Sequence, residues 1–221
     1  MEKIDLAGVG AFLKSIVTSF RNRFDKSPIA TTEVLSSFVQ TRSAYVAQTA
    51  LYGYLKTRMG TRFREYFEDD VFSQSIRIAA VKLFASCLAD FCIYAAAEAA
   101  RDGRLSPDEA AGLARHCFDH GLTQGLVDSD REHVPADVWA TFRARASTTA
   151  WSDAVRGESA FSGSADDLVR FAPVVDEFKA LDREIVTNSI RFRWQPVRET
   201  FRRRLDRDAI AQDWRSRGAL P

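Results

Sequence analysis

The feature that most constrains the fold is a stretch of thirty residues, 71–100, which contains no glycine and no proline. Only four of its side chains are charged, namely Arg77, Lys82, Asp90 and Glu98. Its apolar residues occupy every side of the helical wheel, and such a helix has to be surrounded by other elements. The sequence therefore predicts an all-α fold. We expect a single-domain helical bundle of about six to eight helices around a buried central helix at 71–100, with a C-terminal helical arm.

The same stretch is long enough to span a membrane, so that alternative has to be weighed. In a transmembrane helix, Lys82 and Asp90 would lie near the middle of the bilayer. Charged side chains at that depth cost several kcal/mol on insertion scales. This cost favours a buried core helix over a membrane span.

Composition indicates a soluble globular protein without disulfides. Of the 221 residues, 46% are hydrophobic and 28% are charged, which is typical of one medium-sized domain. A chain of this size buries a full core without disulfides or metal ions. The three cysteines, Cys87, Cys92 and Cys117, lack paired spacing, which indicates buried free thiols in a reducing compartment. We expect a cytoplasmic protein without a cofactor.

A first helix is predicted at residues 4–24, where apolar residues recur at helical spacing. The acidic Glu2 and Asp5, together with Lys14, do not fit a signal peptide. An amphipathic helix of this kind packs on the bundle or lies on an anionic membrane surface through residues 6–24. The side chains proposed for membrane or partner contact are Phe12, Leu13, Ile16, Phe20, Arg21 and Arg23.

A second helix is predicted from residue 31 or 32 to Met59. Its end is marked by Gly60, because glycine is common just after the last residue of a helix. This helix and the central one are the two longest predicted segments in the body of the protein.

The clearest local signal is a capping box that opens a helix after the central one. Ser106 and Glu109 bracket its first turn, and proline occupies the first helical position between them. We expect this helix to end near His120, because Gly121 follows. Another short helix should open at Pro135.

The chain divides at a stretch rich in glycine and serine, residues 157–164. We predict a helical body at 1–155, a loop or hinge at 156–172, and an arginine-rich helical arm at 173–221 that packs on the body. Pro196 should kink or split the long helix of this arm, because proline removes a hydrogen bond and clashes with the preceding turn.

Two spacings resemble catalytic or metal-binding patterns, and neither is complete. His116 and His120 lie four residues apart on one helix, which zinc or iron can accept. Asp119 or the distant His133 could add a ligand, but only two are in register, so we predict no metal site. Residues 157–161 match the first part of a nucleophile elbow but lack its second glycine. No catalytic residue is predicted.

Charge is distributed unevenly along the chain. The net charge is +1, yet residues 1–60 and 181–221 each carry +4 and residues 106–180 carry −6. This pattern favours contact between the basic ends and the acidic middle of one molecule. Arginines and aromatic residues alternate at 191–207, as in nucleic-acid-binding proteins. Interspersed acidic residues and a pI near 7.7 argue against nucleic acid as a partner.

Two internal charges, Arg42 and Asp90, mark the place where a polar site is expected. Each interrupts an otherwise apolar helix surface, and a buried charge requires a partner. We expect them to pair with each other or to border a polar pocket between the second and central helices. The alternative is that Arg42 extends to solvent and Asp90 lies at an exposed edge. The predicted ligand-binding residues are Arg42, Tyr45, Tyr52, Asp90 and Tyr94.

The lack of a complete catalytic pattern favours a non-catalytic helical interaction or scaffold protein, peripheral to the inner membrane face if its first helix binds lipid. Its expected partner is another protein or a second copy of the chain. A small-molecule or lipid-binding bundle is the alternative, and a hydrolase of unrecognised type is the third class. An interaction protein should expose an apolar patch, a binder should contain a cavity, and an enzyme needs converging titratable groups.

Overall fold

The computed structural model describes residues 27–60, 69–157 and 159–218 of the chain. Nine α-helices lie within these ranges, and a single isolated β-bridge is the only β-structure there. The predicted all-α helical bundle is therefore confirmed. The first helix expected at residues 4–24 lies outside the described residues, together with its six proposed contact side chains.

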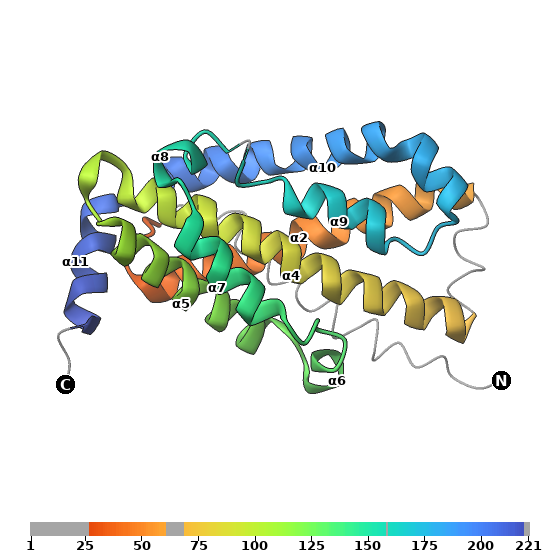
Figure 1. Cartoon of the computed structure of the whole chain (residues 1–221), viewed down its shortest axis with the longest axis horizontal. Helices are drawn as coiled ribbons and strands as arrows, with labels where there is room; N and C mark the ends of the chain where they lie inside the picture. Colours follow the sequence, from red (N-terminus) through yellow and green to blue (C-terminus); the bar gives the residue numbers. More distant parts are fainter. Residues whose placement is uncertain (1–26, 61–68, 158, 219–221) are drawn as a thin grey trace.

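Helix α4 (Asp70–Ala100) forms the centre of the bundle, as its sequence predicts. It packs against α2 (Thr32–Met59), α5 (Pro107–Gly125) and α9 (Gly163–Phe171), and Figure 1 shows it crossing the middle of the molecule. Its apolar length and composition would suffice to cross a membrane, but 78% of the most apolar window is buried in the protein. That burial is what a core helix requires.

The aromatic core gathers around Phe91 on α4, which is fully buried. Its ring contacts Trp194 and Phe201 from α10 (Asp176–Arg204) at centroid distances of 5.4 and 5.5 Å, and Phe38 from α2 at 6.1 Å. Three long helices thus meet through aromatic rings. The rings lie tilted or edge-on to one another, which are arrangements that aromatic pairs prefer.

The predicted ends of the second helix are confirmed. Thr31 caps α2 by accepting a hydrogen bond from the backbone N–H of Val34, and Gly60 follows Met59 as its C-cap. The capping box of α5 is also present, since Ser106 and Glu109 each accept a hydrogen bond from the other's backbone N–H.

The expected end of α5 at Gly121 is wrong, because the helix continues to Gly125. Gly121 lies inside the helix, where α5 packs closely on α4. A Cβ atom added there would stand 2.6 Å from both terminal carbons of Leu88. The glycine therefore serves helix packing and does not terminate the helix.

Several short helices follow α5 along the lower and left-hand parts of Figure 1. They are α6 (Asp128–Arg131), α7 (Val138–Thr148) and α8 (Trp151–Ala154). The stretch 156–172, expected as a loop or hinge, contains α9, which packs on both α4 and α10. Its small residues allow this segment to lie close to α4.

Helix α10 runs along the upper edge of the molecule in Figure 1. It continues through Pro196 as one helix, so the proline does not split it. The chain then turns into α11 (Arg207–Gly218), which contacts α4 and α2. At that turn the backbone of Ile29 exchanges hydrogen bonds with Arg204 and Asp206, 2.8 and 3.0 Å long.

Candidate anion-binding pocket

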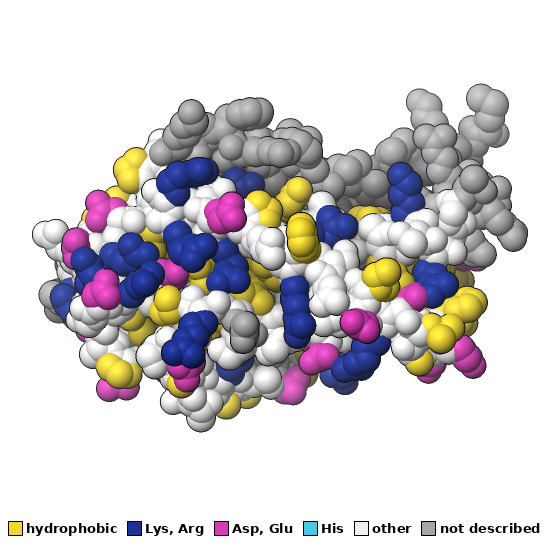
Figure 2. All heavy atoms as spheres, turned by 90° about the horizontal axis from the view of Figure 1, so that it is seen from above, with side chains coloured by type: hydrophobic (Ala, Val, Ile, Leu, Met, Phe, Trp, Pro, Cys, Tyr) yellow, Lys and Arg dark blue, Asp and Glu magenta, His cyan; other side chains and the backbone are white. Residues whose placement is uncertain are grey.

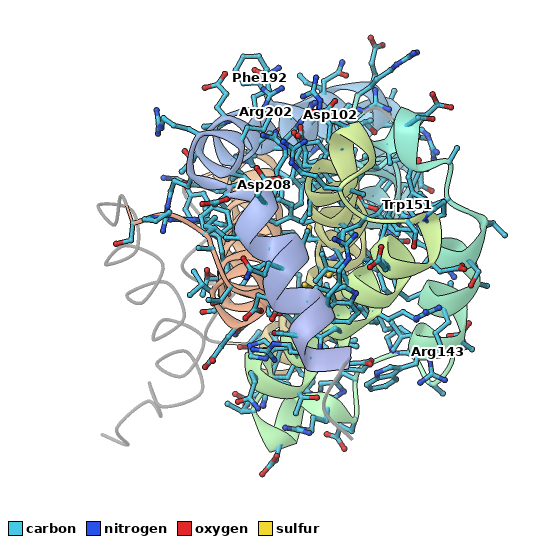
Figure 3. The ribbon with its side chains drawn as sticks, turned by 90° about the vertical axis from the view of Figure 1, so that its left-hand side faces the viewer. Asp102, Arg143, Trp151, Phe192, Arg202 and Asp208 are labelled. Carbon is cyan, nitrogen blue, oxygen red and sulfur yellow. The ribbon has the colours of Figure 1, made fainter. Side chains whose placement is uncertain are left out.

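A cavity of about 600 Å³ opens at the end of the bundle where α4 stops. Its walls come from the last turn of α4, the short 3-10 helix η2 (Arg101–Gly103), the start of α5, α8, and the C-terminal part of α10. Figure 3 views this end of the molecule, with Asp102, Trp151 and Arg202 labelled. The volume lies within the range of small-molecule binding sites.

A reversal of the chain after α4 creates one wall of the cavity. Asp102 and Gly103 both adopt positive φ, 60° and 77°, which bends the backbone away from the helix axis. The end of α4 and the beginning of α5 therefore both line the cavity. The start of α5 presents the positive end of a helix dipole there.

Four arginines from three separate segments line the cavity: Arg101, Arg156, Arg198 and Arg202. In the part of the chain that the structure describes, the side chains of Arg156 and Arg202 make no hydrogen bond or ion pair. Arg101 is 3.8 Å from the Glu98 carboxylate. Figure 2 shows Lys and Arg side chains gathering on the left-hand part of the upper face, toward this end of the molecule.

The most constrained of the four is Arg198. Its guanidinium carbon lies 5.0 Å from the ring centre of Tyr94 and 5.6 Å from that of Phe161, and its Nη2 donates to the carbonyl of Arg156. Its Nε is buried and has no hydrogen-bond partner among the described residues. Gly157, at φ +88°, leaves space for the side chain of Arg198, because a Cβ atom at position 157 would stand 2.5 Å from its guanidinium group.

The two acidic residues of the cavity already have partners. Glu98 is fully buried and accepts hydrogen bonds from the hydroxyl of Tyr94 at 2.9 Å and from Nη2 of Arg207 at 2.8 Å. Asp102 is 3.3 Å from Arg104. Arg207 and Arg104 do not line the cavity, so its lining contains four arginines and two carboxylates and carries a net positive charge.

An apolar wall completes the cavity. Trp151 is half-buried at the first position of α8, and Val155, Leu105 and Ala97 lie among the other lining residues. An indole and several guanidinium groups that line one cavity suit a molecule that combines a flat or apolar part with a phosphate or carboxylate. The lining therefore combines a net positive charge with an apolar surface from Trp151.

The sequence-predicted ligand residues are not brought together as one site. Asp90 and Arg42 are buried, but Asp90 is paired with Arg145, and Arg42 lies over the ring of Phe38 at 5.2 Å. The expected pairing of Arg42 with Asp90 is therefore wrong, because Arg145 on α7 supplies the cation that pairs with Asp90.

Of the three predicted tyrosines, Tyr45 and Tyr52 are half-buried on α2, and burial raises the pKa of Tyr52. Tyr94 is the one predicted residue with contacts to the cavity walls, through its hydrogen bond to Glu98 and its ring face against Arg198. Burial also raises the pKa of Tyr94, so its hydroxyl is a hydrogen-bond donor at neutral pH.

Asp90 does not line the cavity but belongs to a buried hydrogen-bond network between helices. Its carboxylate accepts hydrogen bonds from Nη1 of Arg145 and from the backbone N–H of Ser164, both 2.7 Å long. Arg145 also donates to the carbonyl of Ala160, and Trp194 donates to the hydroxyl of Ser164. Burial raises the pKa of Asp90, although Arg145 opposes that shift. This network ties α4, α7, α9 and α10 together.

The histidine pair does not gather further ligands. His116 packs beside the ring of Trp214, with 5.7 Å between ring centres, and burial lowers its pKa. No group of three or more His, Cys, Asp or Glu side chains suited to a metal ion occurs within residues 27–60, 69–157 and 159–218. Both histidines lie on the α5 surface, half-exposed.

Sequence reasoning singled out Arg198 and Arg202 as members of a basic cluster, but missed Arg101, Arg156 and Trp151. Arg101 lies in one stretch of the chain and Trp151 and Arg156 lie in another, and no local pattern connects the two stretches. The sequence marks Gly157, which follows Arg156, only as part of a loop. Comparison with protein-family models, with curated proteins and with solved structures finds no match for this chain.

Proposed function

We propose that the protein is a non-catalytic, small-molecule-binding helical bundle whose ligand is an anion bearing phosphate or carboxylate groups. The observation that carries this proposal is the convergence of Arg101, Arg156, Arg198 and Arg202 on one cavity of about 600 Å³. Arginine binds both kinds of anion through paired N–H donors.

Isothermal titration calorimetry at low ionic strength tests the proposal, with inorganic pyrophosphate, adenosine monophosphate and citrate as probes. We expect at least one of these anions to bind, and its affinity to fall as salt is added, since screening weakens exposed charge interactions. The double variant Arg156→Gln/Arg202→Gln should lower that affinity by about tenfold or more, because each arginine contributes charge-assisted hydrogen bonds.

Arg203→Gln is the matched control. Arg203 is an exposed neighbour of Arg202 on α10 and does not line the cavity. The substitution removes one positive charge from the same helix and should leave the affinity unchanged. The proposal fails if none of the three anions binds, or if Arg203→Gln weakens binding as much as the double variant does.

A helical interaction protein is the second candidate function. It is supported by a different feature, the apolar side chains that α10 exposes to solvent. Single exposed apolar residues are normal, but an ordered row of them is typical of a protein-binding surface. The row lies toward the other end of α10 from Arg198 and Arg202, so the two candidate functions can be tested separately.

A further inference from the structure

Helix α10 carries an apolar row on its outward side. Leu181, Ile185 and Phe192 are 78%, 72% and 72% exposed, and Phe178 at the start of the row is 46% exposed. The opposite side of the same helix is buried through Val186, Ile190, Trp194, Val197 and Phe201. In Figure 2, which looks down on this edge of the molecule, hydrophobic side chains reach the surface along its right-hand half. The buried side therefore holds α10 in the bundle, and the outer side is not needed for that packing.

The spacing of this row is that of a coiled coil. Phe178, Leu181, Ile185 and Phe192 stand at intervals of three, four and seven residues. Asn188 occupies the one remaining position of the heptad pattern and is exposed. Two helices pair along such a row, and a single polar residue in it fixes their register and orientation. The partner expected from this pattern is another helix of matching spacing.

Two exposed charges beside the row identify that partner as a second copy of the chain. Glu184 and Arg191 lie seven residues apart at equivalent heptad positions. Neither makes an ion pair within the residues that the structure describes. In an antiparallel pair of identical helices, a two-fold axis near residue 187 would bring Glu184 of each copy to Arg191 of the other. Because the contact is symmetric, one oppositely charged pair in the sequence gives two across the interface.

The same axis pairs Leu181 with Phe192 as apolar partners at both ends of the contact. It sets Leu181 of one copy beside Phe192 of the other, and Ile185 beside Asn188. A parallel arrangement would instead place Glu184 beside Ser189 of the other copy, which leaves the charge without a partner. We propose that α10 mediates an antiparallel homodimer through Leu181, Ile185 and Phe192, oriented by reciprocal Glu184–Arg191 pairs.

A charge-exchange experiment on the full chain tests this dimer. Sedimentation equilibrium at low ionic strength gives the dissociation constants. Glu184→Arg alone and Arg191→Glu alone should each weaken the dimer by about tenfold or more, because two attractive pairs become repulsive in each variant. An equimolar mixture of these two variants should form a heterodimer, since opposite charges then face each other at both contacts between positions 184 and 191. The double variant Glu184→Arg/Arg191→Glu should dimerise as the wild type does.

Glu132→Arg is the matched control, because it makes the same change of charge at an exposed position away from α10. It should leave the dissociation constant unaltered. A wild-type chain that stays monomeric up to about 0.1 mM overturns the proposal. The proposal is also overturned if the chain dimerises only after residues 1–26 are removed. That result would mean that the N-terminal segment, and not a second copy of the chain, covers the apolar row. Failure of the two single variants to associate on mixing also overturns it.

Discussion

At the scale of single residues, the fully buried carboxylate of Asp90 links α4 to α7 and α9. The sequence identified it as a charge in need of a partner, and the structure gives it Arg145 and the backbone of Ser164. A buried ion pair contributes little net stability by itself, but removing one member leaves the other charge uncompensated. The partner was mispredicted because Arg145 lies 55 residues away on α7, and nothing in its local sequence points inward.

Arg145→Ala should destabilise the protein by about 3–5 kcal/mol at pH 7. Burial raises the pKa of Asp90 in the folded state, so the folded protein binds a proton more readily than the unfolded chain does. The stability linked to this proton is present at low pH and is lost as pH rises through the folded-state pKa. Without Arg145 the folded-state pKa of Asp90 should rise further. The loss of unfolding free energy caused by Arg145→Ala should therefore be smaller at pH 5 than at pH 7.

Urea denaturation of Arg145→Ala at the two pH values measures this difference. Arg143→Ala on the same helix serves as control, because Arg143 is exposed and is drawn at the periphery in Figure 3. Its effect should stay within about 0.5 kcal/mol. A deficit for Arg145→Ala that is equal at pH 5 and pH 7 would contradict the role assigned to the carboxylate.

At the scale of helices, the crossing of α4 and α5 depends on the absence of a side chain at Gly121. Gly121→Ala should lower the free energy of unfolding by about 1–3 kcal/mol, because its Cβ would overlap Leu88. In the background of Leu88→Ala the same substitution should be neutral or stabilising, since the space is then free and alanine favours helix. A double-mutant cycle by urea denaturation gives the coupling energy, and additive effects would contradict this account.

Helix boundaries and burial were predictable where local chemistry determines them. Thr31, Gly60 and the Ser106–Glu109 capping box are local signals, and each marks the helix end that the sequence indicated. At Pro196 only the possible split is wrong, since α10 continues through the proline. Gly121 was misinterpreted, because its effect depends on a neighbouring helix. The cavity could not be predicted for the same reason, since its arginines meet only after the chain has folded.

At the scale of the whole molecule, acidic side chains link distant helices. Asp182 on α10 accepts from Tyr54 and Arg58 of α2, and Glu109 on α5 accepts from Arg215 of α11. The hydrogen bonds from Arg58 lower the pKa of Asp182, and those from Arg215 lower the pKa of Glu109 to about 2. These contacts join the basic C-terminal helices to the rest of the bundle.

Acid should therefore weaken the bundle through these carboxylates. A lowered folded-state pKa contributes stability that is present above the unfolded value, 4.5 for Glu109, and is lost as pH falls toward about 2. The double variant Arg58→Gln/Arg215→Gln should show a shallower fall of unfolding free energy between these pH values. Because the pairs are exposed, the difference should be small. Circular dichroism during urea denaturation at several pH values measures it, and an unchanged slope would contradict the prediction.

The backbone contact of Ile29 with Arg204 and Asp206 has a consequence for the order of folding. Helices α2, α4 and α5 follow one another in the chain and can pack as soon as they have been synthesised. Ile29 must wait for residues at the far end of the chain, around Leu205. Closing such a long loop is slow compared with local helix pairing. We therefore expect the segment around Ile29, just before α2, to stay exposed to chaperones in the nascent chain until α10 and α11 have left the ribosome.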